Sequence, residues 1–122
     1  MQSSRLALGA AGENRAVQHL CRSGFRIVAR NLRSGGVEID VIAARGSLVV
    51  FVEVKTRRSR RAGLPEEAVD ARKQARLIAG AAAWLREHPR EAARIRFDVI
   101  TCEANGDGFL VRHLEGAFDA NG

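Results

Sequence analysis

Two pairs of charged residues interrupt apolar segments that otherwise read as β-strands. Glu38 precedes Asp40 by two positions, and Glu53 precedes Lys55 by two at the end of the apolar run 48–52. Because side chains alternate across a strand, the members of each pair share a face. Carboxylates that a fold holds close together repel each other unless a cation lies between them. The pattern therefore predicts a metal site.

The two segments read as a β-hairpin with a two-residue turn at positions 45–46. In that register Asp40 lies opposite Phe51, and Glu38 lies opposite Glu53. These side chains then share one side of the hairpin, with Asp40 and Glu53 as diagonal neighbours roughly 7–8 Å apart at Cα. A solvated face is the alternative, but the second strand is apolar on both faces, which is typical of a covered central strand. Glu38 is left open between an acid that supports the site and a solvated end of the sheet.

The composition favours a basic, single-domain protein that spans residues 1–122. The net charge is +6, and all but two of the 20 basic residues, Lys55 and Lys73, are arginine. Because Arg binds phosphate bidentately, this balance predicts a polyanionic partner.

Cys21 and Cys102 lack metal-ligand spacing and fit reduced thiols. The N-terminus has no signal-peptide pattern and no segment is apolar enough to span a bilayer, so we expect a cytoplasmic protein with no membrane partner. Three scattered histidines are expected at the surface rather than as ligands: His19, His88 and His113.

Hydrophobic periodicity predicts the element order α-β-β-β-α-β-β. A first helix, 6–23, ends at Gly24, and a second helix, 65–88, begins at Pro65 and stops before Pro89. Strands are expected at 25–31, within the hairpin 38–56, at 95–102 and at 109–114. The order predicts an α/β fold with a mixed central sheet flanked by helices.

Two charged residues lie where the helical stripes are otherwise apolar. Glu13 shares a face with Val17 and Leu20, at spacings of four and seven. Its stem is short, and it would approach a sheet that already carries acids, so we expect Glu13 to join the site. Lys73 shares a face with Leu77. Its long stem fits either a charge that snorkels to solvent or a contact with nucleic acid.

These residues resemble the YraN family of uncharacterised bacterial proteins. That family belongs by similarity to the PD-(D/E)xK nuclease-like superfamily, near the archaeal Holliday junction resolvases. The resemblance implies a restriction-endonuclease-like αβββαβ core, to which one strand is added here. The residues that carry it are 12–13 (GE), 38–40 (EID) and 51–56 (FVEVKT), and the similarity extends through most of the chain, including 68–69, 73, 84–85 and 97–99.

By position, the resemblance assigns a role to four of the residues named above. Asp40 matches the motif Asp, Glu53 the second acid and Lys55 the motif lysine. Glu13 matches the helical acid of the resolvase branch. Ile39 stands where many members have Pro, as in other diverged members of the superfamily.

Phosphodiester hydrolysis is the chemistry that these residue types suit. Carboxylates from Asp40 and Glu53, with the backbone carbonyl of Val54 and with Glu13, would hold Mg²⁺ (or Mn²⁺), which keeps waters for substrate and nucleophile. Lys55 would orient or deprotonate the attacking water, or stabilise the transition state. A simple ion pair between Lys55 and an acid is the alternative.

The basic segment after the second hairpin strand is a candidate nucleic-acid contact. Arg57, Arg58, Arg60 and Arg61 would hold backbone phosphates without reading sequence, with Lys73 as a further contact. A solvated loop is the alternative. Aromatic residues are scarce, with one Trp, five Phe and no Tyr, which disfavours a stacking platform for single strands and favours duplex or branched DNA.

Three functions are therefore open. The first is a metal-dependent DNA endonuclease, selective for branched or junction DNA. The second is a nuclease-fold accessory protein that binds nucleic acid without cleaving it, and the third is an enzyme that acts on RNA. Resolvases of this type act as two-fold dimers, so a homodimer and a recombination or repair protein are the expected protein partners.

Overall fold

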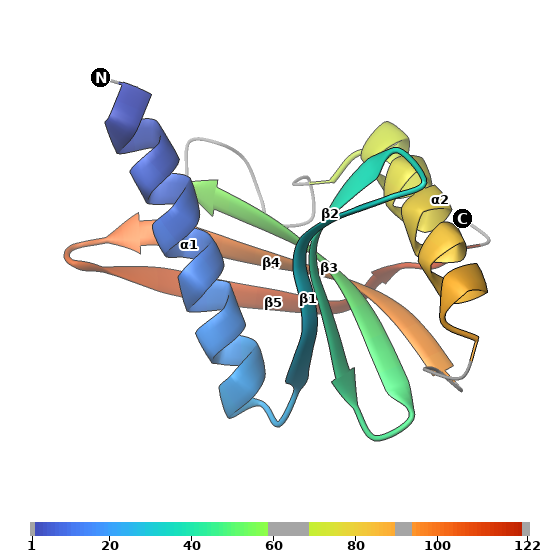
Figure 1. Cartoon of the computed structure of the whole chain (residues 1–122). Coiled ribbons are helices and arrows are strands. Elements are labelled where there is room, and N and C mark those ends of the chain that lie inside the picture. Colours follow the sequence, from blue (N-terminus) through green and yellow to red (C-terminus); the bar gives the residue numbers. More distant parts are fainter. Residues whose placement is uncertain (1, 59–68, 90–93, 121–122) are drawn as a thin grey trace.

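The computed structural model describes residues 2–58, 69–89 and 94–120, with side chains from residue 7 onward. The predicted order α-β-β-β-α-β-β and the mixed α/β class are confirmed, consistent with an αβββαβ core (Figure 1). The elements are α1 (Gln2–Arg22), β1 (Arg26–Ser34), β2 (Val37–Arg45), β3 (Leu48–Arg57), α2 (Ala71–Glu87), β4 (Arg94–Asn105) and β5 (Gly108–Phe118).

The five strands form one mixed sheet in the order β1-β2-β3-β4-β5. All neighbours pair antiparallel except β3 and β4, which run parallel from Leu48–Arg94 to Arg57–Glu103. A parallel pair needs a crossover connection, and the segment that contains α2 supplies it. β3 is therefore the central strand, and its residues 48–52 are all buried, as their apolar run predicts.

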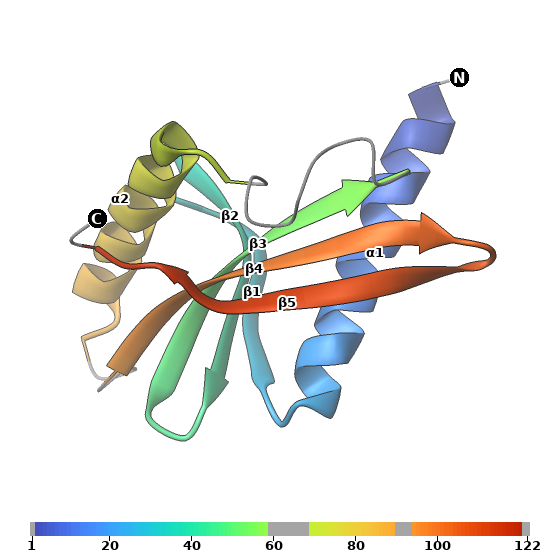
Figure 2. The ribbon, with the colours of Figure 1, turned by 180° about the vertical axis from the view of Figure 1, so that it is seen from behind.

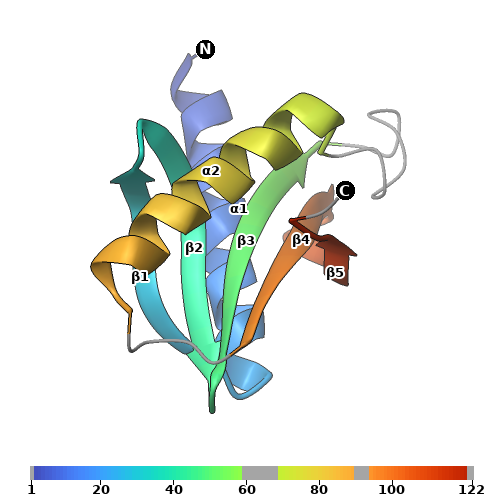
Figure 3. The ribbon, with the colours of Figure 1, turned by 90° about the vertical axis from the view of Figure 1, so that its right-hand side faces the viewer.

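The two helices cover opposite faces of the sheet, with α2 in front of the strands and α1 behind them in Figure 3. Ala16 and Leu20 of α1 pack on the side chains of β3 that include Val50 and Val52. Leu77 and Trp84 of α2 pack on the alternate side chains of the same strand. Figure 2 shows the long β4–β5 hairpin crossing α1. No helix in the described part of the chain is long and apolar enough to cross a membrane.

The start of α2 differs from the prediction. Residues 65–68 lie outside the described residues, but Val69 and Asp70 are not helical, and the helix begins at Ala71. Asp70 caps it, because its carboxylate accepts a hydrogen bond from the Lys73 N–H at 2.9 Å. Asp70 and Pro65 are both good helix-start signals, and the Asp70 cap fixes this end.

The turn of the β2–β3 hairpin is also one residue later than predicted. Arg45 pairs with Leu48, so the turn is Gly46-Ser47, and Gly46 has a φ of +59° that favours glycine at the first turn position. Each partner therefore shifts by two along the opposite strand, and Ile42, not Asp40, lies opposite Phe51. An even shift keeps Asp40 and Glu53 on one face of the hairpin, as predicted.

α1 approaches the sheet closely at Gly12, one residue before Glu13. The Cys102 thiol donates to the Gly12 carbonyl at 3.3 Å, and burial raises the pKa of that thiol to about 11. A Cβ atom on Gly12 would overlap the Thr56 side chain, whereas one on Gly9 would meet nothing within 4 Å. The position of α1 over β3 therefore requires glycine at position 12.

Gly12→Ala should lower the free energy of unfolding by about 1–3 kcal/mol, the usual cost of overpacking a close contact. Gly9→Ala is the matched control on the same helix and should raise it by about 0.5–1 kcal/mol, because Ala favours a helix over Gly. Urea denaturation followed by the fluorescence of the single Trp84 measures both. Equal effects of the two changes would contradict the close approach.

Candidate functional site

Asp40 and Glu53 lie together where the β2–β3 pairing ends. The last pair in the antiparallel register is Val41–Val52, and the two acids are the next residue on each strand. The Val54 N–H donates to Asp40 Oδ2 at 2.8 Å. The Asp40 carboxyl group is thus held against β3 by a backbone group, and it lies nearer to Glu53 than the diagonal arrangement predicted.

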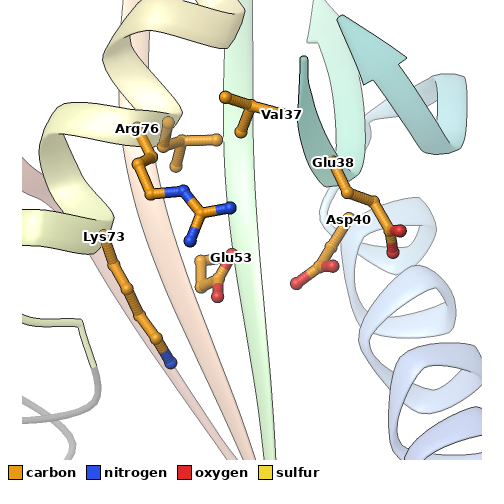
Figure 4. A pocket seen from close by; sticks show the side chains of 7 residues that line it. Val37, Glu38, Asp40, Glu53, Lys73 and Arg76 are labelled. Carbon is orange, nitrogen blue, oxygen red and sulfur yellow. The ribbon is translucent and has the colours of Figure 1, made fainter.

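The two acids line a cavity of about 220 Å³ between the sheet and α2. Figure 4 shows the Asp40 side chain directed toward Glu53, while Glu38 extends the other way and Lys73 and Arg76 approach from α2. The cavity therefore places acids on one wall and cations on the other. The remaining lining residues are Val37 and Leu77.

Burial raises the pKa of the Asp40 carboxyl from 3.8 to about 7. The negative charge of Glu53 is the next largest cause, and that of Glu13 adds to it, while the hydrogen bond from Val54 lowers it. Burial also raises the pKa of Glu53, against the positive charge of Lys73 and a hydrogen bond with Asp40. Two neighbouring carboxyl groups of this kind titrate as a pair and share a proton near neutral pH.

Glu13 lies close enough to raise the Asp40 pKa, but β1 already binds its carboxylate. Glu13 Oε1 accepts from Asn31 Nδ2 at 2.8 Å and from Arg30 Nη2 at 3.2 Å. Asn31 is the only described non-glycine residue with a positive φ, +49°, a conformation that Asn tolerates better than most residues. Glu13, the predicted helical acid, therefore lies near Asp40, and its carboxylate is already hydrogen-bonded to two residues of β1.

Lys55 and Glu38 stand at the margin of the pair. Lys55 is half-buried and is absent from the cavity lining, although its charge lowers the pKa of Glu53. Glu38 is exposed and raises it. For Val54, the structure places the N–H against Asp40; a role for its carbonyl stays a prediction.

The predicted arginine loop differs from the structure at its first residue. Arg57 is the last residue of β3, pairs with Glu103 of β4 and is 6% exposed, so it is not a loop side chain that grips phosphate. Arg58 is exposed. Arg60 and Arg61 lie outside the described residues, and their role stays a prediction.

The donor set of the acid pair fits a hard divalent cation. No group of three or more His, Cys, Asp or Glu side chains within the described residues could hold a metal ion. Mg²⁺ needs fewer protein ligands, because it binds through one or two carboxylates and keeps several waters or phosphate oxygens. Asp40 and Glu53 fit that demand: burial raises the pKa of both, the charge of Glu53 raises that of Asp40 further, and a cation would favour the ionised forms.

Two neighbours of the acids were not predicted to lie at the site. Arg76 joins the cavity through its place on α2, three residues after Lys73. Helical spacing puts Lys73 and Arg76 on one side of α2. The predicted role of Lys73 was therefore the sequence signal that could have identified Arg76. Asn31 binds Glu13 across 18 residues, and no local pattern indicates that contact.

Comparison with known proteins gives the family of this chain. The model of the Uncharacterised protein family UPF0102, which is the YraN family, matches residues 12–102. The chain belongs to the UPF0102 family. It is 42% identical over 122 residues to a UPF0102 protein of Syntrophotalea carbinolica, covering 100% of this chain and 99% of that protein. It is 49% identical over 114 residues to one from Symbiobacterium thermophilum and 46% to one from Rhodococcus opacus, each covering 93% of this chain and 97% of the relative. The UPF0102 match includes every acid of the site, all of α2 and residues 12–22 of α1.

Asp40→Asn should make the protein more stable at high pH, because Asn cannot ionise but can still accept from Val54. The folded pKa of Asp40 is about 7 and its ordinary value is 3.8, so the native state binds more protons between these values. Wild-type stability therefore falls as pH rises from about 4 to about 8. The free energy of unfolding of the variant should exceed that of wild type by up to about 4 kcal/mol near pH 8, at about 1.4 kcal/mol per pKa unit. The difference should vanish near pH 4.

Urea denaturation of both proteins across this pH range gives the difference. Asp107→Asn, in the exposed β4–β5 turn, is the matched control for the loss of one carboxyl group. An Asp40→Asn difference that is constant with pH would contradict a shared proton.

Proposed function

We propose that this protein is a metal-dependent DNA endonuclease that hydrolyses phosphodiester bonds, with selectivity for branched or junction DNA. The observation that carries the proposal is the Asp40–Glu53 pair, two neighbouring half-buried carboxyl groups with raised pKa values that line one cavity with Lys73 and Arg76. Membership of the UPF0102 family and the αβββαβ order support the nuclease-like interpretation. Fold likeness alone would not, because one fold serves many functions.

Asp40 and Glu53 would hold Mg²⁺ or Mn²⁺, with the Val54 carbonyl as a further ligand and Glu13 through water. When bound, the ion supplies Lewis-acid stabilisation of the phosphate and a more acidic water. The Val54 N–H holds Asp40 in place for this role. Lys55 stands two residues beyond Glu53 on β3 and would orient or deprotonate the attacking water.

The cationic wall of the cavity is proposed to bind the DNA backbone. Arg72, Lys73 and Arg76 are exposed on the first turns of α2, and helical spacing gives them neighbouring positions. The N-terminal end of a helix also carries a partial positive charge that favours phosphate. Since Arg57 is buried, the footprint is centred on α2, with Arg58, Arg60 and Arg61 as flanking contacts.

A nucleic-acid-binding accessory protein without cleavage activity is the second candidate. The observation that favours it is that the carboxylate of Glu13, a predicted ligand, is already bound to Arg30 and Asn31. A cytoplasmic location, a homodimer and a recombination or repair partner remain expectations from the sequence.

Millimolar Mg²⁺ or Mn²⁺ should raise the melting temperature, because an ion that binds only the folded form stabilises it. Asp40→Asn and Glu53→Gln should abolish this shift and lower cleavage by orders of magnitude, since each removes a ligating acid. Lys55→Ala should keep the shift and lose cleavage. Thermal melts and assays on labelled duplex, flap and four-way junction DNA, and on RNA of the same sequence, give both readouts.

EDTA is the control for the ion, and Asp107→Asn is the control for loss of an acid elsewhere. A metal-dependent shift without cleavage of any nucleic acid would favour the accessory function. If wild-type protein shows no metal-dependent shift in melting temperature and no cleavage, the metal site itself is contradicted.

Replacing Arg72, Lys73 and Arg76 together by Ala should weaken DNA binding and flatten its salt dependence. The log-log slope falls by about 0.9 for each phosphate that the protein no longer neutralises, so the combined decrease is up to about 3. Fluorescence anisotropy with a labelled junction over a salt series measures it. A variant with Arg86, Arg94 and Arg112 changed to Ala removes the same charge from exposed positions elsewhere and should keep the slope. Equal slopes in both variants would move the footprint away from α2.

A further inference from the structure

A second polar cluster lies on the opposite face of the sheet, where α1 meets β4 and β5. Asp98 of β4 is fully buried. Its carboxylate accepts from Arg96 at 2.8 and 2.9 Å, from the Gly116 N–H at 3.0 Å and from His113 Nε2 at 2.7 Å. Burial by itself would raise the pKa of Asp98, but these hydrogen bonds from His113, Arg96 and Gly116 lower it below its ordinary value. Asp98 is therefore an ionised acceptor, and His113 Nε2 carries a proton.

His113 then links this carboxylate to α1. His113 Nδ1 lies 3.0 Å from His19 Nε2, and the two rings meet edge to face with centroids 5.1 Å apart. A hydrogen bond at this distance needs one donor nitrogen and one acceptor nitrogen. The pair can hold one added proton and keep the bond, but with both imidazoles protonated the two facing nitrogens are donors and repel.

The charges around the pair disfavour the second proton on His19. Burial lowers the pKa of His19 from 6.5, and His113 and Arg15 lower it further, against a smaller opposite effect of Glu115. Arg15 lies one turn earlier on α1, and its Nη1 atom is buried without a hydrogen-bond partner in the described structure. Arg96 and Asp98 complete the β4 side, and the Cys102 thiol is neutral there.

We propose that His19 and His113 form an acid-sensitive latch that holds the C-terminal half of α1 against β5 and opens when both imidazoles are protonated. Asp98 holds His113 in place through its own hydrogen bond. Double protonation therefore breaks only the bond between His113 and His19 of α1. His19 lies six residues after Glu13 on the same helix. Opening of the latch would therefore loosen the helix that brings Glu13 to the Asp40–Glu53 pair, although the latch does not depend on the proposed nuclease activity.

Imidazole ¹⁵N NMR on the full chain tests the latch directly, since the chain has three histidines. His19 should titrate with a midpoint below 6.5, and His113→Gln should move that midpoint upward toward 6.5. Amide resonances of residues 15–22 should shift with the His19 midpoint in wild type and lose that pH dependence in His19→Gln. His88, at the C-terminal end of α2, is the internal control and should be unaffected by either change.

If His113→Gln does not fold, His19→Gln still tests the latch through the amide resonances, because it changes only a partly exposed residue of α1. Fluorescence of the buried Trp84 reports folding of each variant. Linked melts add a second readout: the native state binds fewer protons than the unfolded chain just below pH 6.5, so wild type should lose Tm relative to His19→Gln as pH falls. A His19 midpoint at or above 6.5, or double protonation with no change in α1, would overturn the latch.

Discussion

The hydrogen bond from Val54 N–H to Asp40 holds a carboxyl group in a place where it does not readily ionise. Asp40 lies where the pairing of β2 with β3 ends, one residue beyond the Val41–Val52 pair, with Glu53 beside it on the neighbouring strand. Burial and the Glu53 charge raise the pKa of Asp40 to about 7. A fold that keeps two carboxyl groups in this arrangement bears a cost unless a proton or a cation lies between them.

Each layer of the fold contributes one element of this arrangement. The parallel partner β4 and the two helices bury β3, so Glu53 is fixed on a rigid strand. α2, capped by Asp70, brings Lys73 and Arg76 over the cavity. α1 carries Glu13 to the other side, and its position rests on the Gly12 contact with Thr56 and on the His19–His113 bond. The acid pair therefore lies between one helix that supplies cations and one that supplies a further acid.

The sequence predicted the central strand because VVFVEVK is an apolar run that carries Glu53 near its end. It predicted the acid pair because a hairpin brings the strand of Asp40 beside that of Glu53. The predicted register was wrong by one turn position. Gly46-Ser47 places glycine first in the turn, where its φ of +59° is favourable, whereas Arg45-Gly46 would place arginine there. Arg57 was expected in a loop because a charged residue after an apolar strand usually marks its end, but pairing with Glu103 continues the strand. The expectation of scattered surface histidines was wrong for His19 and His113, which are 94 positions apart and meet only in the fold.

The proposed site depends on a shared proton between Asp40 and Glu53 that a divalent ion can replace. Side-chain carboxyl ¹³C NMR titration of wild-type protein, with and without millimolar Mg²⁺, measures this directly. Without the ion, Asp40 should titrate at about 7, and the ion should move its midpoint to lower pH because the cation favours the ionised form. An Asp40 midpoint near 3.8 that Mg²⁺ leaves unchanged would contradict both the shared proton and the metal site.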